Sequence, residues 1–238
     1  KFRDPRSGLD VDISLDNRLA IHNSMMLKSY AQEERLQRLI QMVKYWASRR
    51  GINNAFEGTL SSYAWTLLSI QHAQLVQPPL APNRQKGVDS NPLSFKGTTY
   101  DVGYSDEHYA TENNQSLASL LISFFDRFAT RWDWENMVVS VRSGEALSTK
   151  SKKWQHTGPL PLEVVTGADD GWMEHVMPIE DPFNHEHDLS RVVRAEGAMT
   201  IQNEFMRIIE LLSKGSSWKD ICEPVMDIEE EPSDLFHD

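Results

Sequence analysis

The sequence predicts an α+β protein that is mostly helical, and three observations lead to this expectation. Several segments place apolar residues three and four positions apart, which is the spacing of one buried helix face. Only two short segments have the alternation or the β-branched content of strands. With 238 residues and 39% hydrophobic composition, the chain can bury a core of ordinary size. We therefore expect one large domain, or one and a half.

The N-terminal elements are predicted first from alternation and then from helical spacing. Residues 10–15 alternate polar and apolar side chains, as a half-buried strand does. Residues 19–30 and 33–50 have helical spacing, and Gly51 is the expected C-cap of the second helix. Thr59 is the expected N-cap of a third helix, which must stop before the two prolines that follow because proline restricts the residue in front of it.

The C-terminal half begins with a long region rich in Pro, Gly, Asn and Asp, residues 77–113. Its length predicts a functional or partly ordered loop, which we interpret as an excursion and not as a domain boundary. Beyond it, spacing predicts an amphipathic helix over 116–131 and a strand over 137–142. A last helix is expected over 200–214 and is ended by Gly215.

Composition limits the class of protein. The longest apolar run, Leu117 to Phe125, is shorter than the roughly 20 residues of a membrane span. Cys222 is the only cysteine, so an internal disulfide and a cysteine-rich zinc site are excluded, as suits a reducing compartment. We therefore expect an intracellular protein, in the cytoplasm rather than in the mitochondrion or the nucleus.

The net charge of −11 opposes binding of a polyanion, because phosphate groups are bound through Lys and Arg. The charge is unevenly distributed, however. Residues 223–238 carry acidic side chains and no Lys or Arg, so they form an acidic tail. A basic cluster precedes it in the chain and consists of Lys28, Arg35, Arg38, Lys44, Arg49 and Arg50. A local basic face can therefore coexist with the acidic tail.

Two segments carry side chains suited to phosphate and metal chemistry. Asp10 and Asp12 could share one face of a strand and hold a divalent metal, although this spacing is also common where a strand end is solvated. The segment from Thr59 to Tyr63 offers backbone N–H groups and hydroxyls at a helix start, with Lys44 as an added charge. The alternative for this segment is an ordinary N-cap with the tyrosine in the core.

A third segment, the proline-framed acidic loop 178–183, is followed by His185 and His187. Two histidines and two acids within eight residues suggest zinc. A further ligand at regular spacing is missing, and a polar loop that caps a helix explains the residues as well.

The order and spacing of these segments resemble the terminal uridylyl- and adenylyltransferases of the DNA polymerase β-like nucleotidyltransferase superfamily, over residues 9 to about 213. The blocks that carry the resemblance are Val11-Asp12-Ile13-Ser14, Asn17, Leu19-Ala20-Ile21-His22-Asn23, Val43-Lys44-Tyr45-Trp46-Ala47, Gly58-Thr59-Leu60-Ser61-Ser62-Tyr63, and Ile179-Glu180-Asp181-Pro182-Phe183 with His187-Asp188-Leu189. Two further blocks look like the poly(A) polymerase-associated region of that family: Asn114-Gln115-Ser116-Leu117 with Phe124-Phe125, and Val139-Ser140-Val141-Arg142.

The resemblance implies a division of the chain. Residues 1–17 would form the C-terminal strand of the nucleotidyltransferase catalytic domain and end its sheet. Residues 18–222 would form a helical central and poly(A) polymerase-associated domain, with a nucleotide-recognition loop near 172–191. Residues 223–238 would remain as the acidic tail. Since only eleven residues precede Asp12, we expect the first two catalytic aspartates on a missing N-terminal segment or on a separate chain.

The resemblance also implies a reaction, the template-independent transfer of UMP from UTP to RNA 3′ ends by a two-metal mechanism with Mg²⁺ or Mn²⁺. Asp12 would be a metal ligand and the general base, whereas Asp10 would have no catalytic role. Tyr63 would stack on the base, and Ser48 stands where the family usually has a second lysine. The residues implied to bind the nucleotide are Asn17, Asn23, Lys44, Ser48, Ser62, Tyr63, Asp181, His187 and Arg191.

Selectivity for uracil is expected from Asp181 and His187, because uracil offers N3–H as a donor and O4 as an acceptor. The resemblance implies that UTP-using relatives have a histidine at the place of His187. Two alternatives stay open: an RNA adenylyltransferase of the same fold, and a non-catalytic helical RNA-binding or adaptor protein. The RNA is expected on the basic helix face around Arg35, Arg38 and Arg49.

Overall fold

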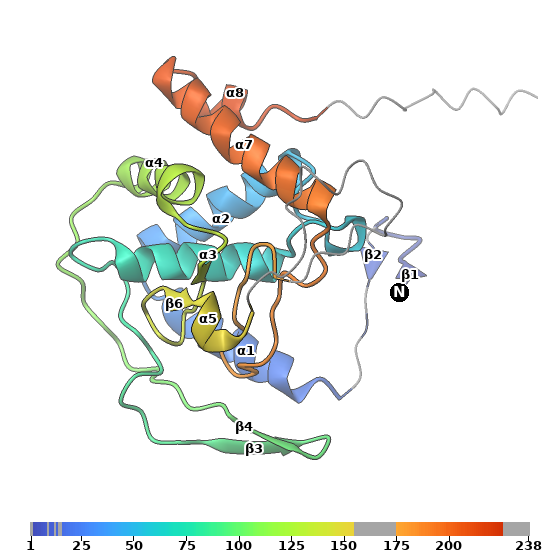
Figure 1. Ribbon diagram of the computed structural model, residues 1–238, viewed down its shortest axis with the longest axis vertical. Helices are drawn as coiled ribbons and strands as arrows, with labels where there is room; N and C mark the ends of the chain where they lie inside the picture. The colour runs from blue at the N-terminus through green and yellow to red at the C-terminus, as the bar shows by residue number, and fades with distance from the viewer. Residues whose placement is uncertain (1, 9, 12, 14–15, 155–174, 226–238) are drawn as a thin grey trace, which may run out of the picture.

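A computed structural model describes residues 2–8, 10–11, 13, 16–154 and 175–225 of the chain (Figure 1). Helices dominate these ranges, and the strands form small two-stranded antiparallel sheets. The prediction of an α+β, mostly helical protein is therefore confirmed. None of the helices in these ranges has both the length and the apolar character that a membrane crossing requires.

Three helices form the N-terminal half of the core: α1 (Arg18–Tyr30), α2 (Glu34–Arg49) and α3 (Ser62–Leu75). α3 is buried on nearly all sides and lies at the centre of the molecule, with α2 packed along it (Figure 1). The predicted bounds of α1 and α2 agree with the structure to within one residue. Gly51 follows α2 with a φ of 67°, a left-handed conformation that glycine adopts without steric cost.

The predicted start of α3 was wrong by two residues. Ser61 is its N-cap, and the Ser61 hydroxyl accepts a hydrogen bond of 3.2 Å from the backbone N–H of Ala64. Thr59 instead donates from its hydroxyl to the carbonyl of Asn54 at 3.0 Å, which closes a loop around a short 3-10 helix, η1 (Ala55–Glu57). Two hydroxyl residues compete for the cap, and the turn before α3 decides between them.

The long polar region contains an antiparallel hairpin of β3 (Pro92–Phe95) and β4 (Thr98–Asp101), which the sequence did not predict. The hairpin lies along the lower edge of the view in Figure 1, below the helices. The buried Arg84 ties the region to the core: its guanidinium donates to the Ser29 carbonyl at 2.8 Å and lies 4.5 Å from the ring centre of Tyr109.

The remaining elements complete the core. In chain order they are α4 (Leu117–Asp126), the π-helical turn η2 (Arg127–Arg131), β5 (Met137–Val138), β6 (Leu147–Ser148), α5 (Thr149–Lys152), α7 (Ala195–Ser213) and α8 (Trp218–Ile221). The predicted strand 137–142 is thus shorter than expected, and β5 pairs with β6. Near the N-terminus, β1 (Phe2–Arg3) pairs with β2 (Asp10–Val11), which is the beginning of the predicted first strand.

The last long helix, α7, begins five residues earlier than predicted because its first turn packs against the loop before α3. The backbone N–H of Arg194 donates to the Gly58 carbonyl at 3.0 Å. Gly197 permits this approach, since a Cβ there would lie 2.0 Å from the same carbonyl oxygen. The packing fixes the segment that leads into Ser61, Ser62 and Tyr63.

Aromatic side chains join the helices of the core. Phe205 of α7 lies within 6.4 Å, between ring centres, of five other rings. Those rings are Trp46 of α2, Trp65 of α3, and Phe124, Phe125 and Phe128 of α4 and η2. All six side chains are buried. The cluster therefore holds α2, α3, α4 and α7 together and sets the frame on which the candidate site is built.

Candidate functional site

Three of the predicted site residues meet at one carboxylate oxygen. Oδ2 of Asp181 accepts hydrogen bonds from Nδ2 of Asn23 at 3.2 Å and from the Tyr63 hydroxyl at 3.4 Å. Asn23 comes from α1, Tyr63 from the first turn of α3, and Asp181 from the loop before α7. These positions are up to 158 residues apart in the chain, so only the fold brings them together.

The other oxygen of Asp181 fixes the orientation of the carboxylate. Oδ1 accepts from the backbone N–H groups of Phe183 at 3.0 Å and Asn184 at 2.9 Å. This local turn is a common arrangement for aspartate at a tight bend. Because Oδ1 is occupied within the loop, Oδ2 is the oxygen that faces Asn23 and Tyr63.

His187 lies opposite Asp181 on the same loop. The backbone N–H of Asp181 donates to the His187 carbonyl at 3.1 Å, so the two residues form a cross-strand pair. Burial lowers the pKa of His187, and the positive charge of Arg191 lowers it further, against the opposing effect of Asp181 and Asp188. The imidazole is therefore neutral at pH 7 and has one N–H donor and one acceptor nitrogen.

Tyr63 keeps its proton. Burial raises the pKa of its hydroxyl, and the neighbouring negative charge of Asp181 raises it further. The hydroxyl is thus a hydrogen-bond donor to the carboxylate at every physiological pH. The phenol ring is half-buried, so one part of it remains accessible to a ligand.

Ser62 is engaged with a residue that sequence reasoning missed. Its hydroxyl oxygen lies 2.9 Å from Nδ2 and 3.1 Å from Oδ1 of Asn53, in the turn between α2 and α3. Asn53 has no distinguishing motif in the sequence. It orients the Ser62 hydroxyl in the first turn of α3, and a helix start can present backbone N–H groups to a phosphate.

The other predicted nucleotide ligands make no hydrogen bond or ion pair with this cluster among the described residues. Asn17 is the N-cap of α1, and its Oδ1 accepts from the Ala20 N–H at 3.2 Å, so a structural role already accounts for it. On α2, Lys44 is half-buried and Ser48 is exposed. Arg191 is exposed beyond the loop. Among the described residues, no hydrogen bond or ion pair joins these side chains to Asp181.

The predicted metal ligand, Asp12, lies outside the described residues. Within the described ranges, no group of three or more His, Cys, Asp or Glu side chains is arranged to hold a metal ion. The zinc alternative for His185 and His187 therefore gains no support. His185 contacts the Pro182 carbonyl with Nε2 at 3.2 Å, a packing role within the loop.

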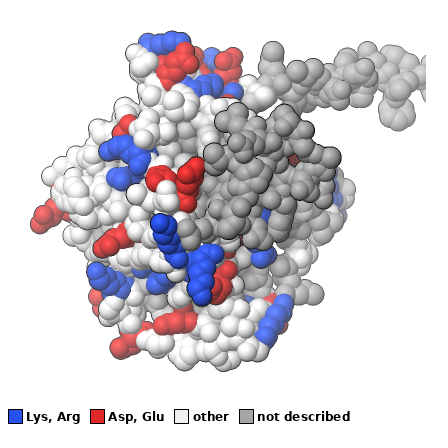
Figure 2. Space-filling model, in the orientation of Figure 1, with Lys and Arg blue, Asp and Glu red and all other residues white. Residues whose placement is uncertain are grey.

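Three members of the basic cluster, Arg35, Arg38 and Arg50, form ion pairs with acidic side chains in the fold. Arg38 pairs with Glu34 at 2.5 Å, and Arg50 with the buried Glu204 at 2.8 Å. Arg35 donates to two backbone carbonyls of the segment before α4, at 2.7 and 3.0 Å. In Figure 2, basic and acidic side chains are interspersed over the described part of the surface that is in view.

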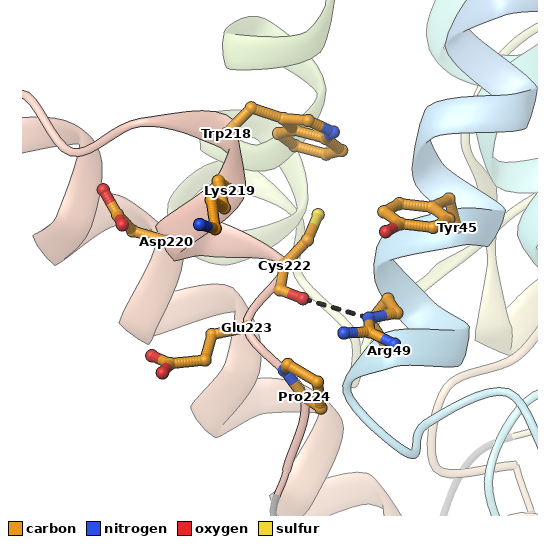
Figure 3. A pocket seen from close by; sticks show the side chains of 8 residues that line it. All are labelled: Tyr45, Arg49, Trp218, Lys219, Asp220, Cys222, Glu223 and Pro224. Carbon is orange, nitrogen blue, oxygen red and sulfur yellow. Dashed lines mark hydrogen bonds between the residues drawn. The ribbon is translucent and has the colours of Figure 1, made fainter.

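A hollow of about 510 Å³ lies between α2 and α8 (Figure 3), and none of the residues that line it belongs to the Asp181 cluster. Tyr45, Arg49 and Trp218 line it, together with Cys222. Adjacent helix residues point about 100° apart, so this hollow is on a different side of α2 from the predicted triphosphate ligands. Burial raises the pKa of Cys222 to about 11, which keeps the thiol protonated and unreactive at neutral pH.

Comparison with known proteins agrees with these features. Residues 116–187 match the family described as Cid1 family poly A polymerase. The chain is 34% identical to terminal uridylyltransferase cid1 of Schizosaccharomyces pombe over 219 residues, which cover 86% of the chain and 51% of that protein. It is 30% identical to poly(A) RNA polymerase GLD2-A of Xenopus laevis, with 87% and 38% covered.

Solved structures give the same result. Cid1 in complex with the UTP analogue UMPNPP superposes with a TM-score of 0.74 and 30% identity, over 88% of this chain and 65% of that one. The chain spans about half the length of the first curated relative. The matched region, the helical fold and the order of the motifs agree, and together they support a nucleotidyltransferase family with a poly(A) polymerase-associated region.

Proposed function

We propose that the full-length protein containing this chain transfers UMP from UTP to RNA 3′ ends without a template. The observation that supports this most strongly is the pairing of an oriented carboxylate, Asp181, with a neutral imidazole, His187, across one loop. A Cid1 structure in complex with its short product ApU supports an RNA substrate of the same kind.

Uracil suits this pair of side chains. Its N3–H would donate to Oδ2 of Asp181 in place of one of the two long contacts that this oxygen accepts, from Asn23 at 3.2 Å and from Tyr63 at 3.4 Å. Its O4 would accept from the N–H of the neutral His187. Adenine presents an amino donor and the N1 acceptor on its Watson–Crick edge. It would leave the imidazole N–H without an acceptor, because it has no oxygen at the place where uracil has O4.

The other contacts would hold the nucleotide in place. Tyr63 would stack on the base, which adds affinity for any base. Asn23 would contact the ribose, since its Oδ1 is buried and has no hydrogen-bond partner among the described residues. Ser62 and Lys44 would bind the triphosphate, with Asn17, Ser48 and Arg191 at the margin of the site.

Divalent metal is part of the proposal, with Mg²⁺ or Mn²⁺ held by Asp12 and by carboxylates outside the described residues. A Cid1 structure was solved with MgGTP bound, which supports Mg²⁺. The metal would neutralise charge on the triphosphate and on the leaving pyrophosphate. Asp12 would accept the proton of the RNA 3′-hydroxyl.

RNA adenylylation is the second candidate. The chain is similar to the GLD2 poly(A) RNA polymerases at 29 to 30% identity, which is close to its similarity to cid1. The Asp181 and His187 pair favours uracil over this alternative, because both polar groups of uracil then find a partner.

Nucleotide incorporation on a short labelled RNA, with each NTP supplied separately, tests the proposal. The full-length protein is expected to extend the RNA with UTP, and Asp12→Ala to abolish extension. Asp10→Ala is the matched control and is expected to retain activity, since Asp10 has no assigned role. Incorporation that survives Asp12→Ala, or that requires ATP, would reject uridylyl transfer by this site.

A further inference from the structure

The loop that carries Asp181 and His187 is the end of a short antiparallel ladder. Glu180 and Asp188 form an isolated antiparallel bridge directly below the Asp181 and His187 pair. Leu189 donates from its N–H to the Ile179 carbonyl at 2.9 Å and continues the ladder. Successive side chains of an extended segment point to opposite faces. Glu180 and Asp188 therefore lie on one face of the ladder, and Asp181 and His187 on the other.

Glu180 is 1% exposed and is surrounded by donors. The Ser140 hydroxyl donates to Oε2 at 2.5 Å, and Arg142 donates with Nη2 to Oε1 at 2.9 Å and with Nε to Oε2 at 3.2 Å. Lys152 donates to Oε1 at 3.1 Å and also reaches the His185 carbonyl. Burial alone would raise the pKa of Glu180, but the hydrogen bonds from Arg142 and Ser140 outweigh it and lower that pKa.

Asp188 is 2% exposed and holds the second stem of the ladder. Its Oδ1 accepts from the N–H of Ile179 at 3.0 Å, from the N–H of Ser190 at 2.9 Å and from the Ser190 hydroxyl at 2.9 Å. Its Oδ2 lies 2.7 Å from Nδ1 of His175. The carboxylate thus joins both stems of the loop directly, through backbone groups.

The carboxylates of Glu180 and Asp188 are also connected through side chains that lie outside the ladder. The Lys152 ammonium lies 4.7 Å from the ring centre of Trp154. The Trp154 ring is stacked on His175, with ring centres 5.1 Å apart and an interplanar angle of 8°. The interactions therefore run from Glu180 through Lys152, Trp154 and His175 to Asp188, and close a ring around the base of the loop.

Stability alone is a weak reason for this arrangement. The free-energy cost of removing the charges from water offsets most of the attraction between them. Apolar residues of similar size in place of a buried ion pair often give a protein of equal stability. Each buried carboxylate is, however, the immediate neighbour in the chain of a residue that is proposed to face the nucleotide. A shift of either stem would move Asp181 and His187 relative to each other. A fixed spacing between these two side chains is what the proposed recognition of uracil over adenine requires.

We propose that Glu180 and Asp188 are positioning residues for nucleotide selection, which fix the separation of Asp181 and His187 from the opposite face of the ladder. The proposal rests on the proposed function for its link to uracil. The fixed geometry of the loop is a separate property and is measurable without turnover.

Two variants test the proposal in the full-length protein. Glu180→Gln keeps the size of the side chain and removes its charge, and Lys152→Met removes one donor from the periphery. The control is Glu204→Gln. Glu204 lies on α7, outside the loop, and like Glu180 it is a buried carboxylate that is paired with an arginine: it is 8% exposed and lies 2.8 Å from Arg50. Lys152→Arg retains the cation and is expected to restore the behaviour of the unaltered protein.

The readouts are KM and kcat for UTP and ATP, and amide hydrogen exchange of residues 181–187. Glu180→Gln is expected to raise the KM for UTP about tenfold, with little change in kcat, because a charge-assisted hydrogen bond to the stem is weakened. The ratio of UTP to ATP use is expected to fall about fivefold or more, and exchange in 181–187 to accelerate about tenfold. Glu204→Gln is expected to lower the melting temperature without these changes.

Selectivity and exchange that stay unchanged in Glu180→Gln and Lys152→Met, or that change equally in Glu204→Gln, would overturn the positioning role. If the unaltered protein prefers ATP or incorporates no nucleotide, the proposed function fails instead. The exchange rates then still decide whether the two buried carboxylates hold the loop.

Discussion

Truncation of Tyr63 separates the two contributions that this residue is proposed to make. Tyr63→Phe keeps the ring and removes only the hydroxyl, whose 3.4 Å contact with Asp181 is at the long end of hydrogen-bond distances. Loss of such a contact is expected to cost about 0.5–1 kcal/mol. Tyr63→Ala also removes the stacking surface, worth about 1–3 kcal/mol for one base. The KM for UTP should then rise about two- to fivefold in the first variant and about 10- to 700-fold in the second.

Steady-state extension of a short RNA at varied UTP concentration measures both variants, with circular dichroism as the control for folding. The loss in Tyr63→Ala should be similar for UTP and ATP, because stacking is tolerant of base identity. Folded Tyr63→Ala protein with an unchanged KM would refute the stacking role. If Tyr63→Phe raises KM by a larger factor than the additional loss of the ring in Tyr63→Ala does, the hydroxyl and not the ring makes the main contribution of this residue to UTP binding.

Three predictions concern the frame around the site. Phe205→Ala empties the centre of the aromatic cluster and should lower the free energy of unfolding by about 3–5 kcal/mol, read from urea denaturation; a loss below about 1 kcal/mol would contradict the packing. Gly197→Ala should destabilise the protein by about 1–3 kcal/mol, since its Cβ would collide with the Gly58 carbonyl, and an unchanged melting temperature would contradict that contact. His72 has a folded-state pKa lowered to about 3, by burial and then by the charge of Arg127, against an ordinary value of 6.5. The unfolded chain therefore binds the extra proton between these values, and the stability difference between the unaltered protein and His72→Gln should shrink by about 2–3 kcal/mol as the pH falls from 6.5 to 4.5; a difference independent of pH would reject this.

Helices that bury one regular face could be predicted from the sequence, because apolar spacing records that face directly. This is the case for α1 and α2. Their ends were less certain where several cap residues adjoin, as at Thr59 and Ser61. The β3–β4 hairpin was missed because its turn is Lys96-Gly97, with φ of 50° and 80°, and lysine is an unusual residue for the first position of such a turn.

The candidate site was predictable only where its residues belong to motifs. Asn23, Tyr63 and Asp181 were named from their blocks, and the fold brings them together. The partners that hold them were not named for this role. Asn53 lies in a polar turn without a motif, and the donors to Glu180 come from 28 to 40 residues away in the chain. Such contacts depend on tertiary packing, which local periodicity does not encode.

Nucleotide preference in direct competition is the most direct test of the central claim that Asp181 and His187 select uracil. The full-length protein is given equal concentrations of UTP and ATP with one labelled RNA, and the added nucleotides are read by mass. We predict that the unaltered protein adds uridine and that His187→Ala adds both nucleotides. Preferential addition of adenosine by the unaltered protein, or a preference for uridine that survives loss of the imidazole, would contradict the account.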